Sequence, residues 1–143
     1  MSKKLVVKKN IELDAHISKV WDALTNPELT KQYFFGCEAM SDWKPESPIV
    51  FKQVAEGKDI VQVKGVITNI EPQKVLQHTC LTPEFEDDPS KHTTVTYELS
   101  SNEGRTQLSI TQGDFGEDET RYNHTAAGWD HVLNGLKTVV ENQ

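Results

Sequence analysis

The C-terminal end of the chain carries the pattern that most restricts the fold, a long segment with apolar residues at helical spacing. We predict a helix from about Asp118 to Glu141, with acidic residues at the end where the helix dipole favours negative charge. With residues about 100° apart, one broad stripe collects the apolar side chains of Tyr122, Ala126, Trp129, Val132, Leu133, Leu136, Val139 and Val140. Such a helix, roughly 36 Å long, has to bury this stripe against another layer.

The rest of the chain supplies that layer as strands with one apolar face. Leu5, Val7, Ile11 and Leu13 share one parity and polar residues occupy the other, which indicates a strand with one buried face. Further strands are predicted at Ile49–Val54, Asp59–Ile70, Lys74–Leu81, His92–Leu99 and Thr106–Gln112, the last two as a hairpin. The sequence therefore predicts an α+β fold in which a six-stranded antiparallel sheet packs against the C-terminal helix.

Two short helices are expected after the first strand. The spacing of apolar residues predicts one from about His16 to Leu24. Pro27 suits the first turn of a second helix, through about Tyr33, because its missing N–H would have no partner there anyway. The chain is then predicted to form a loop through Trp43 to Pro48, and a second, acidic loop from Pro83 to Ser90.

Length and charge restrict the class of protein. A chain of 143 residues fits one domain, spanning residues 1–143. The net charge of −7 would repel phosphate backbones, so nucleic acid is not an expected partner. No apolar stretch approaches the roughly 20 residues that a membrane span needs. Cys37 and Cys80 form no CxxC pair and no signal peptide precedes Leu5, so we expect reduced thiols in a cytoplasmic protein.

Several segments together resemble a known superfamily. They are Val20 to Glu28 (Val-Trp-Asp-Ala-Leu-Thr-Asn-Pro-Glu), Trp43 to Ile49 (Trp-Lys-Pro-Glu-Ser-Pro-Ile), the Glu71-Pro72 turn, and Gly128 to Leu136 (Gly-Trp-Asp-His-Val-Leu-Asn-Gly-Leu). In this order and spacing they are similar to the START-like (SRPBCC, helix-grip) superfamily. The most similar branch is that of the C-terminal domain of the activator of Hsp90 ATPase, and the resemblance extends from about Val6 to Val140.

The resemblance implies a curved antiparallel sheet gripping the long helix, with two short helices between the first two strands. It also implies a cavity, because members of the superfamily bind lipids, sterols, polyketides and other apolar molecules there, and some catalyse cyclisation or hydrolysis. The sequence departs from the pattern at Glu46, where relatives often have glycine in the turn before the second strand. It also has no room for the separate N-terminal domain of the eukaryotic co-chaperone.

An apolar cavity with a few directed polar groups is the expected binding site. From strand parity and the helix stripe we predict that it is lined by Trp21, Tyr33, Phe34, Trp43, Phe51, His78, Tyr97, Phe115, Trp129 and Leu133. The alternative is that these side chains simply fill the core. Tyr97 and Trp129 are the strongest candidates, because each has one polar atom that needs a partner once it is buried.

His78 lies in the middle of a predicted strand, between Gln77 and Thr79 on the opposite face. It is either a satisfied or solvent-facing residue or a candidate acid or base, which would need a carboxylate or hydroxyl within hydrogen-bond reach. No other catalytic constellation, cofactor motif or metal motif is present, and His124 and His131 fall on the polar side of the last helix. We therefore predict no catalytic residues, no cofactor and no metal site.

Gly128 and Gly135 stand inside the predicted C-terminal helix, seven residues apart, at the edge of its apolar stripe. Each costs roughly 1 kcal/mol relative to alanine in a helix interior, so each needs a compensating role. They either allow close packing against the sheet or the short helices, or leave space for a ligand at the rim of the cavity.

Three functional hypotheses follow. The first is a protein that binds a small hydrophobic molecule between the sheet and the C-terminal helix. The second is an Hsp90-associated or other protein-interaction module, as the resemblance implies. The third is an enzyme acting on an apolar or aromatic compound, with His78 or Tyr97 as acid or base. The sequence leaves the ligand and the oligomeric state open.

Overall fold

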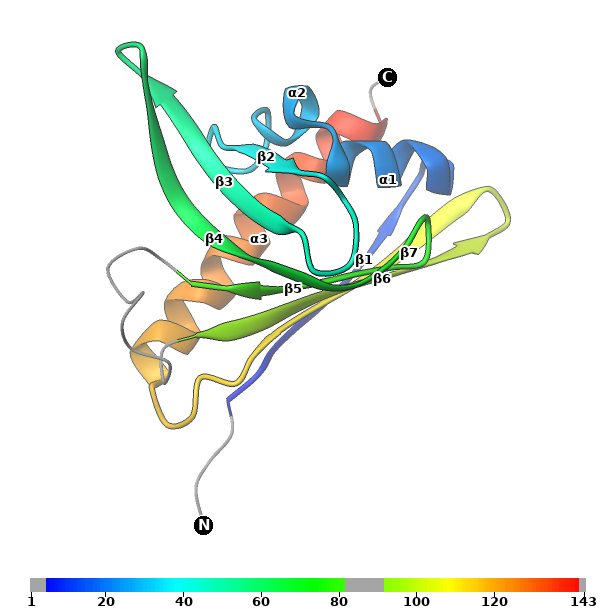
Figure 1. Cartoon of the computed structure of the whole chain (residues 1–143). Helices are drawn as coiled ribbons and strands as arrows, with labels where there is room; N and C mark the ends of the chain where they lie inside the picture. The colour runs from blue at the N-terminus through cyan, green and yellow to red at the C-terminus, as the bar shows by residue number, and fades with distance from the viewer. Residues whose placement is uncertain (1–4, 82–91, 142–143) are drawn as a thin grey trace.

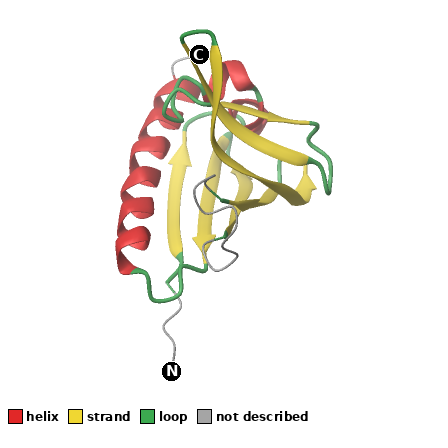
Figure 2. Cartoon of the chain, turned by 60° about the vertical axis from the view of Figure 1, so that its left-hand side comes forward, coloured by secondary structure: helices red, strands yellow, loops and turns green. Residues whose placement is uncertain are grey.

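The long C-terminal helix α3 (Glu119–Glu141) lies along one side of a curved antiparallel sheet (Figures 1 and 2). The computed structural model describes residues 5–81 and 92–141. The predicted loop from Pro83 to Ser90 lies outside these residues. None of the described helices is long and apolar enough to cross a membrane.

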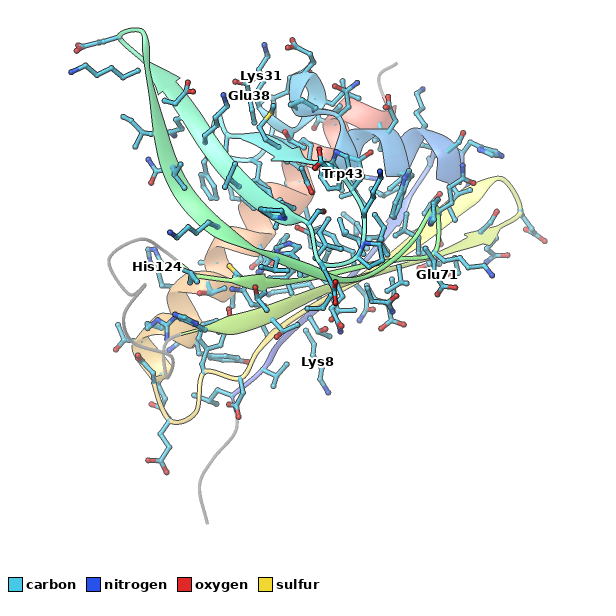
Figure 3. All side chains as sticks on the ribbon, in the orientation of Figure 1. Lys8, Lys31, Glu38, Trp43, Glu71 and His124 are labelled. Carbon is cyan, nitrogen blue, oxygen red and sulfur yellow. The ribbon has the colours of Figure 1, made fainter. Side chains whose placement is uncertain are left out.

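The sheet has the strand order β1-β7-β6-β5-β4-β3-β2, and every neighbouring pair is antiparallel. The strands are β1 (Val7–Leu13), β2 (Glu38–Ser41), β3 (Pro48–Ala55), β4 (Lys58–Glu71), β5 (Val75–Cys80), β6 (Thr93–Asn102) and β7 (Arg105–Gly113). In β1, β6 and β7 buried residues alternate with more exposed ones, and Figure 3 shows Lys8 of β1 projecting to the outside of the sheet. This agrees with the predicted alternation of buried and exposed residues.

The sheet has seven strands, so the prediction of six was wrong. The additional strand, β2, lies in the segment that was predicted to be a loop, and it pairs with β3 with Ala39 opposite Phe51. Its apolar pattern is too short to be detected, because only Ala39 is buried while Met40 is exposed. Tertiary hydrogen bonds stabilise β2, because it pairs with β3 along its length and the Ala39 N–H donates to Oγ1 of Thr30 at 2.9 Å.

Two short helices follow β1, as predicted: α1 (Ile17–Thr25) and α2 (Pro27–Thr30). Asn26 ends the first and caps the second, where its side chain accepts from the Glu28 N–H and Pro27 occupies the first turn. The second helix is shorter than predicted, because the chain tightens after Thr30 into turns in which the Tyr33 N–H bonds the Thr30 carbonyl.

The apolar stripe of α3 faces the sheet, as predicted. Trp129, Val132, Leu133, Leu136 and Val140 are buried, and Tyr122, Ala126 and Val139 pack partly buried against the core. The opposite side, with Asp130 and Lys137, is exposed. Asp118 begins the helix by accepting the Arg121 N–H on Oδ1 at 3.1 Å, and an ion pair of 3.0 Å joins Asp130 to Lys9 of β1.

Candidate functional site

The space between α3 and the sheet differs between the two halves of the helix. From Trp129 onward the helix packs closely, and a void of only about 10 Å³, room for about one water molecule, remains beside Leu133 and Leu136. Under the first half there is a cavity of about 600 Å³, where α3 contributes Arg121, His124 and Gly128. Its volume exceeds the roughly 300 Å³ expected of a ligand site.

The cavity contains most, but not all, of the predicted lining residues. Phe34, Phe51, His78, Tyr97, Phe115 and Trp129 line it. Tyr33 and Leu133 line only the small void, where the Tyr33 hydroxyl donates to the Ala23 carbonyl at 2.6 Å and burial raises the tyrosine's pKa.

Trp21 and Trp43 line neither space. Trp21 packs half-buried against the edge of the core from α1. Trp43 stands after β2 with a left-handed φ of 57°, and Figure 3 shows it well apart from His124. The prediction that Trp43 lines the cavity was therefore wrong. It was based on strand parity and helical spacing, and neither pattern predicts where a side chain on such a turn points.

Aromatic rings form a continuous wall of the cavity. Phe34 stacks on Phe51 with ring centroids 4.7 Å apart, and it meets Trp129 edge-on at 5.9 Å. His78 lies between Phe51 and Tyr97, with centroid distances of 5.8 and 5.9 Å. Such contacts are favourable beyond the apolar area that they bury, so this wall is a pre-formed surface for a flat or apolar molecule.

His78 contributes to this wall a buried polar atom, Nε2, that lacks a partner among the described residues. It is 2% exposed, and its Nδ1 lies 2.8 Å from the Thr79 carbonyl oxygen. Because a carbonyl only accepts, Nδ1 carries the proton and Nε2 holds a lone pair. Nε2 is buried and has no hydrogen-bond partner among the described residues. Burial lowers the pKa of His78 to about 4, so the ring is neutral at neutral pH.

An irregularity between β4 and β5 makes the Thr79 carbonyl available to His78. Lys64 and Leu81 exchange both backbone hydrogen bonds, at 2.9 and 3.0 Å, so a regular ladder would next bond Val66 to the Thr79 carbonyl. Instead the Val66 N–H donates to Oγ1 of Thr79 at 2.9 Å. A Cβ on Gly65 would lie 1.8 Å from the Thr79 carbonyl oxygen, so only glycine fits there.

Trp129, Gln112 and Thr93 form a hydrogen-bond network in the wall of the cavity. The Trp129 indole N–H donates to Oε1 of Gln112 at 2.7 Å, and the Gln112 amide donates to Oγ1 of Thr93 at 3.0 Å. That amide also lies 3.6 Å from Sγ of Cys80, whose pKa burial raises to about 11. Trp129, which was predicted to need a partner, therefore has one within the protein.

Sequence reasoning missed Gln112, Thr93 and Cys80 as cavity residues. A signal was present for Gln112, which continues the buried parity of Leu108 and Ile110 on β7. A polar residue on an otherwise apolar strand face marks a buried hydrogen-bond network. His124, assigned to the polar side of α3, is exposed yet borders the cavity.

The two helix glycines have different surroundings. A Cβ on Gly135 would lie 2.7 Å from Cβ and 3.3 Å from Cα of Tyr33, so Gly135 allows close packing against the segment after α2. A Cβ on Gly128 would meet only the Phe35 ring, at 3.9 Å, and Gly128 borders the cavity. Close packing therefore accounts for Gly135, whereas Gly128 lies beside the open space of the cavity.

The described residues include no group of three His, Cys, Asp or Glu side chains placed to hold a metal ion. Cys37 and Cys80 are free thiols, and both border the cavity.

Comparisons with known proteins agree with the fold. The model of the family described as Activator of Hsp90 ATPase homolog 1-like protein matches residues 14–141. The solution structure of ChR145 from Cytophaga hutchinsonii is similar, with 35% identity, a TM-score of 0.81, and coverage of 99% of this chain and 97% of that one. No curated protein matches the chain.

Two further structures share the fold at lower identity. Protein MLL2253 from Mesorhizobium loti is 22% identical with a TM-score of 0.79, covering 96% of this chain and 98% of that one. The Aha1 dimer from Colwellia psychrerythraea is 20% identical with a TM-score of 0.74, covering 95% of this chain and 96% of that one.

Proposed function

Because the chain belongs to the Activator of Hsp90 ATPase homolog 1-like family, within the START-like superfamily, we propose that it binds a small hydrophobic molecule in the cavity under the first half of α3. The observation that carries the proposal is a volume of about 600 Å³ walled by aromatic rings. An apolar ligand would gain roughly 25 cal/mol for each Å² of apolar surface that it removes from water there. We place the protein in the cytoplasm, where its free thiols would stay reduced.

Native mass spectrometry of the protein purified from its own cells tests this proposal. We expect an additional mass that disappears when the protein is denatured. The blocking variant is Gly128→Leu, because its Cβ meets no clash and its side chain would occupy the cavity. The matched control is Ala127→Leu, which adds a larger side chain to the exposed side of the same helix.

Wild type and Ala127→Leu should both retain the additional mass, and Gly128→Leu should lose it. Retention by all three would place the ligand elsewhere. No additional mass in any of them, together with no binding of apolar probes, would count against the proposal.

A second candidate is an interaction with Hsp90, which the description of the family suggests. It is also supported by the large apolar side chains that β2 and β4 expose, Met40, Ile60, Val61 and Val66. A pull-down with Hsp90 and an assay of its ATPase rate test this candidate. Absence of binding at tens of micromolar protein would remove it, and replacing Val61 and Val66 by threonine should weaken any binding that is found.

A catalytic role for the same cavity is the weakest candidate. The lowered pKa of His78 makes its Nε2 a poor general base at neutral pH, because a catalytic base works best when its pKa is close to the working pH. A neutral, poorly basic imidazole is better suited to accepting a hydrogen bond than to removing a proton. If an activity is found, double replacement of His78 and Tyr97 without loss would exclude these residues as its acid and base.

A further inference from the structure

We propose that the ligand of the cavity presents to His78 an uncharged aromatic group whose hydroxyl or N–H donates a hydrogen bond to Nε2. This inference rests on the proposed function and specifies the chemistry of its ligand.

The first step is the cost of the unpaired nitrogen. His78 is 2% exposed, and its Nε2 finds no partner in residues 5–81 and 92–141. A buried acceptor without a donor loses its hydrogen bond to water and gains none in return. A ligand donor would remove that penalty, so it contributes more to binding than a hydrogen bond at an exposed site.

The second step is the direction of the hydrogen bond. The Thr79 carbonyl, 2.8 Å from Nδ1, holds the proton on that nitrogen. Moving the proton to Nε2 would leave two lone pairs facing each other at Nδ1. Nε2 therefore acts as an acceptor only, and a ketone, ether or carboxylate oxygen placed against it would be repelled.

The third step is that two neighbouring polar side chains of the wall, Trp129 and Gln112, are already paired, so among the fully buried side-chain polar atoms of the described residues only Nε2 of His78 lacks a partner. The Trp129 indole and the Gln112 amide bond each other and Thr93, at 2.7 and 3.0 Å. His78 lines the cavity between the rings of Phe51 and Tyr97, and its unpaired Nε2 lies buried in this wall, so a ligand donor reaches it by displacing part of the wall. Because aromatic rings lie on both sides of His78, a donor attached to an aromatic ring, such as the hydroxyl of a phenol, can stack on these rings while it donates.

The fourth step is the charge. Burial keeps the imidazole neutral, so His78 would not supply the positive charge that an anionic ligand needs. A neutral donor loses little on leaving water compared with an ion, so the group bound at His78 is uncharged, whereas Arg121 supplies a positive charge elsewhere in the lining, beside the Phe115 ring.

The test compares 2-naphthol with 2-methoxynaphthalene, which have the same ring system but differ in the donor. Binding is followed by calorimetry and by the tryptophan fluorescence of the protein, to which Trp129 in the cavity wall contributes. We expect wild type to bind 2-naphthol about tenfold more tightly. His78→Phe should bind both probes about equally, because it keeps a ring and removes the acceptor. The control is His131→Phe, the same change at an exposed histidine that does not line the cavity, and it should keep the tenfold difference.

Equal binding of the two probes by wild type would overturn the inference and leave the proposed function in place, as expected if a tightly held water already occupies Nε2. Binding of neither probe would overturn both. Should His78→Phe fail to fold, ¹⁵N NMR of the imidazole in wild type decides the question. The Nε2 resonance should move with 2-naphthol and stay unchanged with 2-methoxynaphthalene, and an unmoved resonance with 2-naphthol would contradict the inference.

Discussion

The unpaired Nε2 of His78 lowers the stability of the fold, and in our proposal the same atom binds the ligand. Nδ1 of His78 bonds the Thr79 carbonyl, and the buried Nε2 has no partner among the described residues. From sequence alone, His78 could be assigned to a strand, but not to the inner or outer face, because Leu76 shares its parity and polar neighbours occupy the other. The structure turns Leu76 and His78 inward, so an unpaired polar atom is buried together with an apolar side chain.

The pH dependence of stability should reflect this buried histidine. The pKa of His78 is lowered to about 4 in the folded protein, from 6.5 when unfolded. The unfolded chain therefore binds a proton that the folded protein does not, and stability is lost as pH falls through 6.5 toward about 4. We expect this residue to account for a loss of about 2 kcal/mol between about pH 7 and about pH 5.

Urea unfolding at both pH values measures this effect. His78→Phe should lack that part of the loss, whereas His131→Phe should retain it. The same loss in His78→Phe as in wild type would show that His78 is not buried in its neutral form.

Glu46 offers a second prediction for a single residue. Its φ of 71° is in the left-handed region that favours glycine. Its side chain is exposed, while its N–H donates to the Ile67 carbonyl at 2.7 Å. Glu46→Gly should therefore stabilise the protein by up to about 1 kcal/mol, as measured by chemical unfolding. Glu46→Ala keeps the Cβ and the strain, so an equal gain from that control would contradict the explanation.

At the scale of elements, α3 combines two kinds of packing. All of its buried residues lie from Trp129 onward, while residues of its first half border the cavity. The two interior glycines follow this division, since Gly135 contacts the Tyr33 backbone and Gly128 faces open space and the Phe35 ring. Helical spacing predicted the apolar stripe. The spacing is the same in both halves of the helix, so it cannot show which apolar side chains pack against the protein and which line a cavity.

Alanine at the two glycines should have opposite effects on the free energy of unfolding. Gly128→Ala gains helix propensity without a clash and should stabilise by about 1 kcal/mol. Gly135→Ala gains the same propensity, but its Cβ would lie 2.7 Å from Cβ of Tyr33, and overpacking of this kind costs about 1–3 kcal/mol. Thermal and urea unfolding of the pair measure the difference, and two changes of the same sign would contradict the assigned packing.

At the scale of the whole molecule, the interior under α3 differs between its two ends. The solid end lies under α3 from Trp129 onward, where little space remains, and the hollow end lies under the residues before Trp129, where the cavity is. The solid end joins α3 to α1 and α2 through Tyr33, Leu133 and Leu136. The hollow end joins α3 to the sheet mainly around the cavity. Fewer buried apolar contacts in the hollow end mean that it should open more readily than the solid end.

Hydrogen exchange should detect this difference. We expect the backbone amides of residues 132–140 to exchange more slowly than those of residues 123–128, and a bound ligand to slow exchange mainly in the first half of α3. Uniform exchange along α3 in the ligand-free protein would contradict the division of the molecule into two ends.

The sequence by itself determined what depends on local spacing. Some features depend only on residues that are close together in the chain, so the sequence reveals them directly. They are the apolar stripe of α3, the alternation in β1 and β7, the Pro27 turn and the resemblance carried by Val20–Glu28. They were enough to predict an α+β sheet closed by a helix.

Only the tertiary structure decided β2, the position of Trp43, the hydrogen bonds of Gln112 and the unpaired nitrogen of His78. Each depends on which strands lie side by side and on where their register slips, as it does between β4 and β5. Pairing and register join residues that are far apart in the chain, and neither spacing nor propensity records such contacts.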